Sequence, residues 1–417
     1  MGFRDKMLLT ARACKPLLTK VIPLSVLKKM KKNMLERELA GIIARTKEEI
    51  DMTAHPFGVN LIGNVKGDFG LGQSTRLVAR ALEETGIPYS IYQYSHARDA
   101  KMNDTTFDHR ISQELPYQIN LVHINPPELE EAYLTLDKKL WEKHYNIAFW
   151  LWELEEFPDK FMKVVPLFQE IWTPAEFISQ GIRKKTNIPV KTLPYCVDAP
   201  SDDACDREFF GLPEDKFLFL AMYDTNSVAE RKNPKGIIRA FQEAFLPDNN
   251  KVGLVLKVNS AKPEDLEEIR AQFKEYDNIY LITSHMTKVE VNSLVKCVDV
   301  FVSLHRSEGY GLVLAEAMLL GTPTIATNWS ANTEFADAES ACLVGYELIP
   351  ITEDIGPYEK GNHWADADLH QAAAYMEKLY EDPEFYQQIS HQGMIRIHEV
   401  VAMERVAGIW KKALTDI

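Results

Sequence analysis

Cysteine is scarce in this sequence and never clustered. No two cysteines form a C-x-x-C pair, and the five stand far apart: Cys14, Cys196, Cys205, Cys297 and Cys342. An odd number at such spacing excludes a disulfide scaffold and a zinc ribbon. This cysteine pattern fits a reducing compartment, so we expect a cytoplasmic protein.

Long apolar runs are also missing. No run of roughly 18 consecutive apolar residues, the length that a bilayer requires, occurs in the chain, so no membrane-spanning helix is expected. The start, MGFRDKMLLTARACKPLLTK, is basic and lacks an apolar core followed by small residues, so no secretory signal is expected. Apolar residues still make up 46% of the 417, which excludes wholesale disorder and predicts two or three globular domains.

Acidic residues outnumber basic ones except at the start of the chain. The net charge is −14, yet residues 1–45, here called the arm, hold eleven lysines and arginines against three acidic residues. The arm therefore carries +8 and the rest −22, which disfavours nucleic acid as a partner. Apolar residues alternate with these cations, and Pro16 and Pro23 divide the arm into short pieces. The arm either binds an anionic membrane surface, at about 1 kcal/mol per cation, or packs on the acidic body.

Segments with strand and helix character alternate from about residue 57 onward. In the first half, strands are predicted at 58–63, 90–94, 119–124, 145–150 and 170–173, and helices at 75–84, 159–168 and 175–184. In the second half, strands are predicted at 217–222, 253–258, 279–282, 298–303 and 322–326, and helices at 234–244 and 288–296. Such alternation predicts parallel sheets covered by helices on both faces.

A stretch rich in Pro and Asp, 191–212, separates the two halves, so the sequence predicts two α/β domains with a cleft between them. We place these domains at 46–198 and 199–394, between the arm at 1–45 and a final segment at 395–417. One long amphipathic helix is expected from Ile395 to Leu414. Ligands of such sheets lie where the carboxyl ends of strands meet loops and helix N-termini.

The segment 303–332 has the most specific pattern. A predicted strand ends at Ser303, a loop with Glu308 follows, and then a helix that contains Glu316. Gly309 and Gly311 let the backbone approach a ligand and leave free N–H groups at the helix start, which suits anionic oxygens. Two carboxylates and bare amides facing one cleft suit a sugar phosphate ester, with carboxylates on hydroxyls and amides on phosphate.

Glu308 and Glu316, separated by seven residues, resemble the E-x7-E signature of retaining glycosyltransferases of family 4. Further segments that resemble this family are the glycine loop FGLGQS at 69–74, His123 after a strand, and the basic pair Arg231-Lys232. The resemblance covers most of the chain except the arm. It implies the GT-B fold: an α/β chain of two Rossmann-like, doubly wound domains, an N-terminal acceptor domain and a C-terminal donor domain. The terminal helix would cross back to the N-terminal domain.

The resemblance also implies a role for each matching residue. Glu308 would bind the donor sugar, Glu316 the nucleotide ribose, and Arg231 and Lys232 the departing diphosphate, whose growing negative charge fixed cations stabilise. His123 would be a further catalytic residue. The remaining donor-binding residues would be Gly309, Tyr310, Gly311, Leu312, Gly70 and Gly72. No metal or other cofactor is expected, and no D-x-D motif follows a predicted strand.

Acceptor or sugar contacts are predicted at four positions. The run FWLWELEEFP sets aromatic rings beside acids, which suits a carbohydrate and equally suits core packing, and it supplies Trp152 and Glu153. Asn125 follows His123, and His305 precedes Glu308, each near the site in sequence. One departure from the family is Met222-Tyr223-Asp224, which stands where a Gly-Arg pair is common. His285 and Met286 are expected near the nucleotide base, on the basis of their position in the chain alone.

Other functional classes fit less well. A dinucleotide-binding oxidoreductase needs G-x-G-x-x-G, but this loop reads Gly67-x-x-Gly70-x-Gly72, and no acid ends the second predicted strand. A P-loop motif is missing too. A non-catalytic scaffold of the same fold at a membrane and a sugar-nucleotide epimerase stay open, as does a phosphorylase, although no lysine for pyridoxal is identifiable.

The sequence therefore predicts a retaining, metal-independent hexosyltransferase. It would move a sugar from a UDP- or GDP-sugar to a glycan or lipid-linked acceptor, as in bacterial surface polysaccharide or glycoconjugate assembly. Its partners would be the nucleotide-sugar, the acceptor and, through residues 1–45, an anionic membrane surface. The expected location is the cytoplasm, with peripheral attachment at the inner face of the cell membrane.

Overall fold

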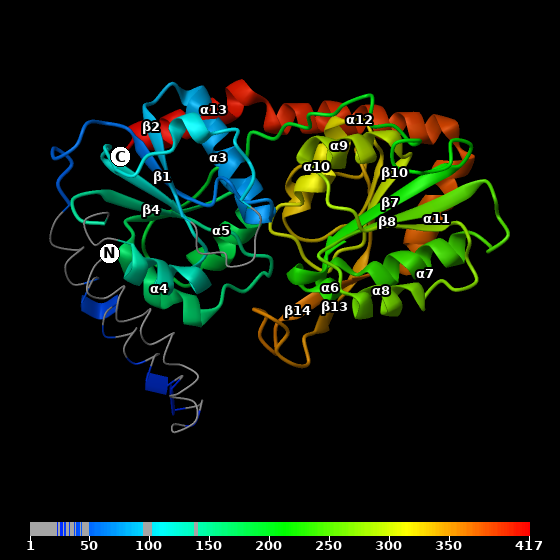
Figure 1. The fold of residues 1–417 in the computed structure, drawn as a ribbon, viewed down its shortest axis with the longest axis horizontal. Helices are drawn as coiled ribbons and strands as arrows, with labels where there is room; N and C mark the ends of the chain where they lie inside the picture. Colours follow the sequence, from blue (N-terminus) through cyan, green and yellow to red (C-terminus); the bar gives the residue numbers. More distant parts are fainter. Residues whose placement is uncertain are drawn as a thin grey trace.

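The structure is a computed structural model that describes residues 50–94, 102–136 and 141–417, with scattered positions between 23 and 43. The two alternatives for the arm concern residues that lie almost wholly outside this described part. The described chain forms two halves side by side along the long axis of the molecule, each built around one large sheet (Figure 1).

The N-terminal half contains a sheet of six parallel strands in the order β2-β1-β3-β4-β5-β6. They are β1 (Val59–Gly63), β2 (Tyr89–Gln93), β3 (Ile119–His123), β4 (Tyr145–Phe149), β5 (Glu170–Thr173) and β6 (Val190–Thr192). β1 and β3 are buried along their whole length, which explains their nearly continuous apolar character. The five predicted strands are confirmed, whereas the short edge strand β6 was not predicted.

The C-terminal half contains a second sheet of six parallel strands, in the order β12-β11-β10-β7-β8-β9. They are β7 (Phe217–Asp224), β8 (Val252–Asn259), β9 (Ile279–Ile282), β10 (Val300–Ser303), β11 (Thr324–Thr327) and β12 (Cys342–Val344). The five strands predicted here are confirmed. An antiparallel hairpin of β13 (Tyr346–Pro350) and β14 (His363–Ala367) follows and was not predicted.

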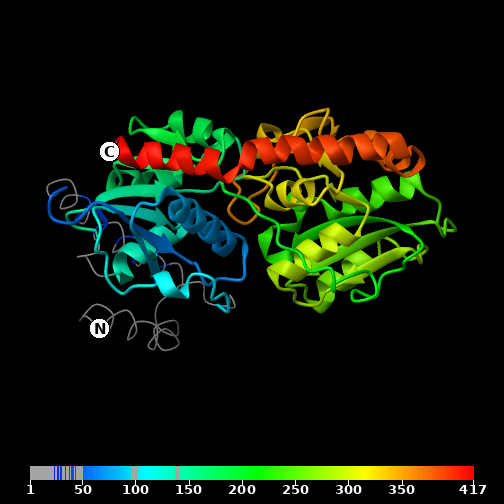
Figure 2. The same cartoon turned by 90° about the horizontal axis from the view of Figure 1, so that it is seen from above.

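Helices pack around both sheets (Figures 1 and 2). In the N-terminal half they are α3 (Gly70–Thr85), η1 (Asp108–Arg110), α4 (Pro126–Thr135), η3 (Asp159–Leu167) and α5 (Glu176–Arg183). Then come η4 (Thr225–Ser227), α6 (Ala229–Lys232), α7 (Pro234–Ala244), α8 (Pro263–Arg270), α9 (Lys288–Cys297), α10 (Leu312–Leu319), η5 (Ala331–Glu334), α11 (Leu369–Glu381), α12 (Pro383–Val401) and α13 (Met403–Thr415). The predicted α/β class with two doubly wound sheets is confirmed. Within the described residues, no helix has the length and apolar character to cross a membrane.

Two local predictions in the N-terminal half are wrong. The segment expected as a helix at 159–168 is the 3₁₀ helix η3, and it contains Pro166, which has no N–H to donate. The expected glycine loop is shorter than predicted, because α3 already begins at Gly70. Gly72 is needed for packing: a Cβ at this position would lie 2.1 Å from the Gly67 carbonyl oxygen.

The terminal helix is divided in two, contrary to the prediction. α12 and α13 meet at Ala402, whose ψ of 122° is extended and ends the first helix. α12 packs on α10 of the C-terminal half and α13 on α3 of the N-terminal half. The pair, red in Figures 1 and 2, therefore runs along both halves and ties them together.

Trp410 anchors α13 to the N-terminal half. Its side chain is fully buried, and its Nε1 donates a hydrogen bond of 2.9 Å to the Pro194 carbonyl. The indole lies 5.7 Å from the Phe149 ring and 5.6 Å from the Trp172 ring, measured between centroids.

We therefore expect Trp410→Ala to lower the free energy of unfolding by about 3–5 kcal/mol, the usual cost of deleting a buried large aromatic side chain. Met403→Ala, at an exposed position of the same helix, should change it by less than about 0.5 kcal/mol. Urea unfolding followed by circular dichroism measures both. Equal stability of the two variants would contradict the anchoring role.

Candidate functional site

The loop between β10 and α10 forms the centre of the candidate site. It ends at Gly311, whose φ of 90° lies in the left-handed region that favours glycine, and α10 starts at the next residue. The first N–H groups of a helix have no partner within the helix, so they offer donors to an anionic ligand. Gly309 lies against the other half, where a Cβ would come within 2.9 Å of the Trp152 carbonyl oxygen.

Glu308 is buried in this loop and is held by two cations. Its Oε1 lies 3.1 Å from Nη1 of Arg231 and also forms an ion pair with Nζ of Lys232. Burial alone would raise the pKa of Glu308, but Lys232 and Arg231 outweigh it and lower this pKa to about 2. Glu308 is therefore ionised throughout the physiological range.

A strained turn after β7 supplies the two cations. Val228 precedes α6 with a φ of 54°, which is costly for a β-branched residue, and Asn233 follows α6 with a φ of 52°. The Asn233 side chain then caps α7 by accepting a 3.1 Å hydrogen bond from the Gly236 N–H. The Arg231 guanidinium is buried and donates to the Ser307 carbonyl at 3.0 Å, so it is fixed beside the Glu308 loop.

Glu316 lies inside α10 with no exposed surface. Lys288 Nζ lies 2.5 Å from its Oε1, but neither carboxylate oxygen has a hydrogen bond of good geometry among the described residues. Burial raises the pKa of Glu316, and the Lys288 charge partly opposes that rise. A buried carboxylate with unused acceptor capacity suits the hydroxyl groups of a ligand.

His123 ends β3 and is also fully buried. Its Nε2 lies 2.6 Å from Ser74 Oγ, which in turn bonds the Tyr195 hydroxyl, while Nδ1 has no partner among the described residues. Burial lowers the pKa of His123 to about 3, so its imidazole is neutral near pH 7. A neutral imidazole in this position can hydrogen-bond a ligand, but it is not the imidazolium ion that could act as a general acid.

The acceptor-side candidates differ in how free their side chains are. Trp152 is engaged in packing: its Nε1 donates to the Glu156 carbonyl at 2.9 Å and its ring contacts Phe157. Asn125 accepts a 3.0 Å hydrogen bond from the Leu151 N–H. Glu153 is half-buried. Burial lowers the pKa of Arg231, but the charge of Glu308 and, to a smaller extent, that of Glu153 raise it. Of these three, Glu153 is the side chain whose charge acts on the Glu308 cluster, and it also hydrogen-bonds Tyr358.

His305 lies in the same loop as Glu308 but is locked by the protein. Nδ1 lies 3.0 Å from Ser303 Oγ, and Nε2 lies 3.0 Å from Asn332 Oδ1. Burial lowers the pKa of His305, so this imidazole is neutral near pH 7 as well. Its role in the described structure is to fix the loop.

The glycine loop of the N-terminal half faces the C-terminal half. Asp68 Oδ2 lies 3.9 Å from His285 Nε2, in the segment after β9 where the nucleotide base was predicted. Gly70 is exposed with open space around its Cα, whereas Gly72 is packed as described above. The loop is thus opposite the C-terminal half, and of these two glycines only Gly70 offers open backbone.

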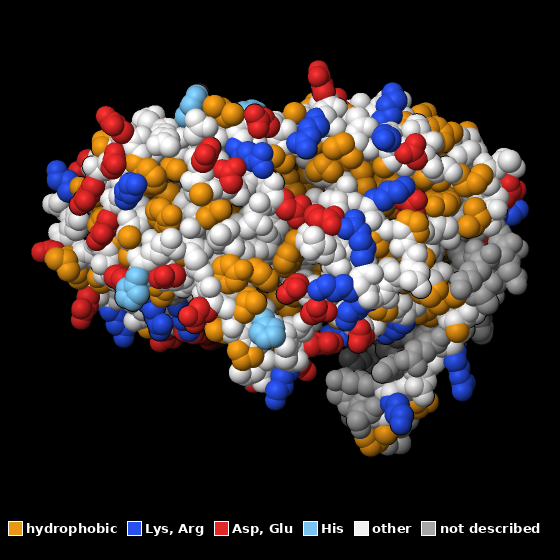
Figure 3. All heavy atoms as spheres, turned by 180° about the vertical axis from the view of Figure 1, so that it is seen from behind, with side chains coloured by type: hydrophobic (Ala, Val, Ile, Leu, Met, Phe, Trp, Pro, Cys, Tyr) orange, Lys and Arg blue, Asp and Glu red, His pale blue; other side chains and the backbone are white. Residues whose placement is uncertain are grey.

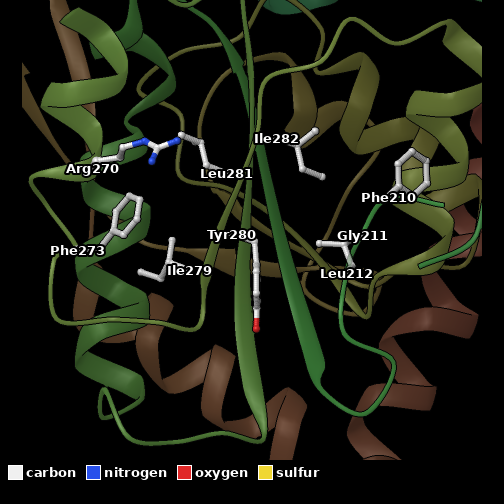
Figure 4. Close-up of a pocket in the computed structure, with 9 residues that line it drawn as sticks. All are labelled: Phe210, Gly211, Leu212, Arg270, Phe273, Ile279, Tyr280, Leu281 and Ile282. Carbon is white, nitrogen blue, oxygen red and sulfur yellow. The ribbon is translucent and has the colours of Figure 1, made fainter. Parts of the chain in front are cut away.

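A separate pocket of about 310 Å³ lies along β9, the edge strand of the second sheet, and its lining residues are drawn in Figure 4. Aromatic side chains of Phe210, Phe273 and Tyr280 line it together with Arg270. None of the site residues predicted from the sequence lines this pocket.

The comparisons with known proteins concern mainly the second half. Residues 204–395 match the sequence model of the family described as "Glycosyl transferases group 1". Because of this match, we call residues 204–395 the group 1 domain. Among curated proteins, sucrose synthase 7 and sucrose synthase 5 of Oryza sativa subsp. japonica are each 29% identical over 158 residues. That alignment covers 35% of this chain and only 17% of either relative.

Solved structures resemble the whole two-domain arrangement. Sucrose-phosphate synthase of Thermosynechococcus elongatus has a TM-score of 0.64 at 13% identity, over 86% of this chain and 98% of the other. Anabaena Alr3699/HepE, in complex with UDP and glucose, has a TM-score of 0.61 at 11% identity, over 87% and 100%. At such identity the likeness shows the fold, and the fold is GT-B, as the sequence predicted.

The N-terminal half touches the group 1 domain directly at the candidate site. Ser307 Oγ donates a hydrogen bond to the Glu153 carbonyl, next to Glu308. Glu334 accepts hydrogen bonds of 2.9 and 2.8 Å from the N–H groups of Glu176 and Phe177, so it caps α5 across the domain boundary. These contacts hold the two halves together around the loop at 304–311.

Two residues of the group 1 domain that lie at the site were not predicted. Lys288 pairs with Glu316, and the sequence signal for it is indirect: Thr287-x-x-Glu290 reads as a capping box that starts a helix at Lys288. Tyr358, between β13 and β14, is buried beside Glu153 and 5.6 Å from the Trp152 ring, measured between centroids. No sequence signal marks it, because the whole hairpin was missed.

No group of three or more His, Cys, Asp or Glu side chains that could hold a metal occurs in the described part of the chain. Metal independence stays a prediction.

Because of its ion pairs, Glu308 should make the stability of the folded protein depend on pH in the acidic range. The pKa of Glu308 is about 2 in the folded protein and ordinarily 4.5, so its stabilising effect is complete above about pH 4.5 and is lost as pH falls toward 2. Glu308→Gln should therefore be less stable than the wild type at pH 6, and this difference should shrink at pH 3. Urea unfolding at both values measures it.

Glu347→Gln, at an exposed position on β13, is the matched control and should show little difference at either pH. A Glu308→Gln deficit that stays constant from pH 6 to pH 3 would contradict the ion-pair assignment.

Proposed function

We propose that this protein is a retaining glycosyltransferase that moves a sugar from a nucleoside-diphosphate sugar to a glycan or lipid-linked acceptor. The observation that carries the proposal is the cluster of Glu308, Arg231 and Lys232 beside the N-terminus of α10. It lies in the group 1 domain and at the contact between the two halves. Relatives of this fold have been solved with UDP or UDP-glucose bound, so UDP is the first donor nucleotide to test.

The cations would act on the leaving group. As the bond between the anomeric carbon and the diphosphate breaks, negative charge grows on the phosphate oxygens. Arg231 is fixed by the Ser307 carbonyl and Lys232 by Glu308, so they can stabilise this charge with little rearrangement. Glu308 would hydrogen-bond the donor sugar and favour the positive charge that develops at the anomeric carbon.

The remaining residues would bind the two substrates. Glu316 would hold the ribose hydroxyls, and the backbone of residues 309–312 would hold sugar and phosphate oxygens. On the acceptor side, Glu153 would contact the acceptor, and the neutral His123 would hydrogen-bond the sugar. Closure of the two halves would exclude water and bring the acceptor hydroxyl to the face that the diphosphate leaves, which retains the anomeric configuration.

Calorimetric titration with UDP, GDP and NAD tests the donor site. We expect one nucleoside diphosphate to bind saturably, and Glu316→Ala to weaken it at least tenfold, because the ribose would lose its acceptor. Lys232→Ala should lower the rate of UDP release from a UDP-sugar by about 10²–10³, since one fixed charge on the leaving group is gone.

Glu347→Ala and Lys235→Ala, at exposed positions of the same domain, are the controls and should behave like the wild type. Binding of NAD alone would overturn the proposal. A protein that binds UDP but releases no sugar from any donor, with or without acceptor, would instead be a scaffold, and one that converts the donor sugar would be an epimerase.

We further propose a cytoplasmic protein attached to the inner face of the cell membrane by the arm, with an acceptor in surface polysaccharide assembly. The arm concentrates a charge of +8 within residues 1–45. Elsewhere, acidic and basic side chains are interspersed, as on the described part of the face in Figure 3. A membrane-bound enzyme would meet a lipid-linked acceptor at the bilayer.

Vesicle sedimentation tests this attachment. The full chain should bind vesicles containing phosphatidylglycerol and should be released by 0.5 M salt, roughly the range in which ionic screening becomes strong. Residues 46–417 alone should not bind. Neutral phosphatidylcholine vesicles are the control, and equal binding of both proteins, or equal binding to neutral vesicles, would contradict the proposal.

A further inference from the structure

Glu316 and Lys288 form an ion pair that the proposed function does not use. The two residues lie on neighbouring helices, α10 and α9, which are in contact. The Glu316 carboxylate is fully buried, while the Lys288 side chain is 29% exposed. Taking a carboxylate out of water is costly unless a charge partner and hydrogen bonds replace the solvent, and here the partner is Lys288.

The backbone holds Lys288 at a fixed point. It is the first residue of α9, and the residue before it forms a reciprocal capping box: Thr287 Oγ1 accepts from the Glu290 N–H at 3.2 Å. The Glu290 carboxylate accepts from the Thr287 N–H at 2.6 Å. Because these two hydrogen bonds fix the first turn of α9, they also fix the position of the Lys288 Cα relative to Glu316.

The other charged group that faces Glu316 repels it. Asp198, from the segment that joins the two halves, raises the pKa of Glu316, and Asp198 itself forms an ion pair with Arg80 of α3. Lys288 therefore opposes both the burial of Glu316 and the Asp198 charge. Neither Glu316 oxygen has a hydrogen bond of good geometry within the described structure, so both keep acceptor capacity that the hydroxyl groups of a ligand could use.

We propose that Lys288 is a positioning residue that pairs with the buried Glu316 carboxylate and holds it in place for the hydroxyl groups of the donor nucleotide. This inference rests on the proposed function, since the ligand is the ribose of a nucleoside diphosphate. An ionised carboxylate accepts hydrogen bonds from both ribose hydroxyls, whereas a protonated one has less acceptor capacity. Donor affinity, rather than the bond-breaking step, should depend on Lys288.

The inference makes a prediction about pH. Burial raises the pKa of Glu316 and Lys288 lowers it, so Lys288→Met should raise this pKa further and let Glu316 gain a proton more readily as pH falls. We expect Lys288→Met to weaken UDP binding about tenfold at pH 7.5 and by more at pH 6. Lys288→Arg, which keeps the charge, should restore most of the affinity. Calorimetry gives each dissociation constant.

Matched variants separate this role from a structural one. Lys296→Met is the control on the same helix, where the lysine pairs with an exposed aspartate, and it should bind UDP like the wild type. In a Glu316→Gln background, Lys288→Met should cause no further loss, because no carboxylate is left to position. Measured in the Glu316→Gln background, the pH dependence of UDP binding shows how much of the effect comes from protonation of the nucleotide phosphates rather than of Glu316. 2′,3′-Dideoxy-UDP, which lacks both hydroxyls, should bind wild type and Lys288→Met alike.

The results distinguish a failure of the Lys288 role from a failure of the proposed function. Unchanged UDP affinity in Lys288→Met would overturn this inference and leave the proposed function intact. An equal loss in the Glu316→Gln background, or for the dideoxy nucleotide, would overturn it too, because Lys288 would then act on the phosphates or the fold directly. A wild type that binds neither UDP nor GDP would overturn the proposed function and this inference together.

Discussion

The structure of the candidate site depends on the buried charge cluster of Glu308, Arg231 and Lys232. Glu308 and Arg231 are buried and Lys232 is 25% exposed, and buried charges are stable only when they are paired and held in good geometry. The chain meets this condition with a strained turn at Val228, a capped helix at Asn233 and a hydrogen bond from Arg231 to the Ser307 carbonyl. The loop that carries Glu308 is therefore held both at its backbone, through the Ser307 carbonyl, and at the Glu308 side chain.

The same loop is also where the two halves meet. Ser307 bonds the Glu153 carbonyl, Gly309 lies against Trp152, and the buried ring of Tyr358 reaches the same place from the hairpin of β13 and β14. Glu359 of this hairpin pairs with Lys160 of the N-terminal half at 2.8 Å. Because both halves contribute to one small region, their relative placement and the geometry of the site are coupled.

Burial and the neighbouring charges together determine the protonation state of each site residue. Glu308 stays ionised because its two cations outweigh desolvation, whereas His123 and His305 are neutral because desolvation dominates. Glu316 lies between these cases, with burial and Lys288 opposed. Residue type alone therefore says little about the chemistry available at this site.

Most strands of the two large sheets and the Glu308–Glu316 motif could be predicted from the sequence alone. Parallel strands buried on both faces, such as β1 and β3, need nearly continuous apolar runs, and these are visible without any structure. The spacing of Glu308 and Glu316 is likewise local, since both lie within one strand–loop–helix unit. Arg231 and Lys232 were found through a family resemblance, because no spacing rule joins them to Glu308.

Which side chains meet, and how far each is exposed, depended on the tertiary fold. Lys288 reaches Glu316 from a different helix, Tyr358 arrives on a hairpin, and Trp152, a candidate sugar contact, turns inward to pack. The division of the last helix at Ala402 lets α12 pack on one half and α13 on the other. The physical reason is that pairing, burial and pKa depend on neighbours far apart in sequence, whereas hydrophobic periodicity depends on neighbours along the chain.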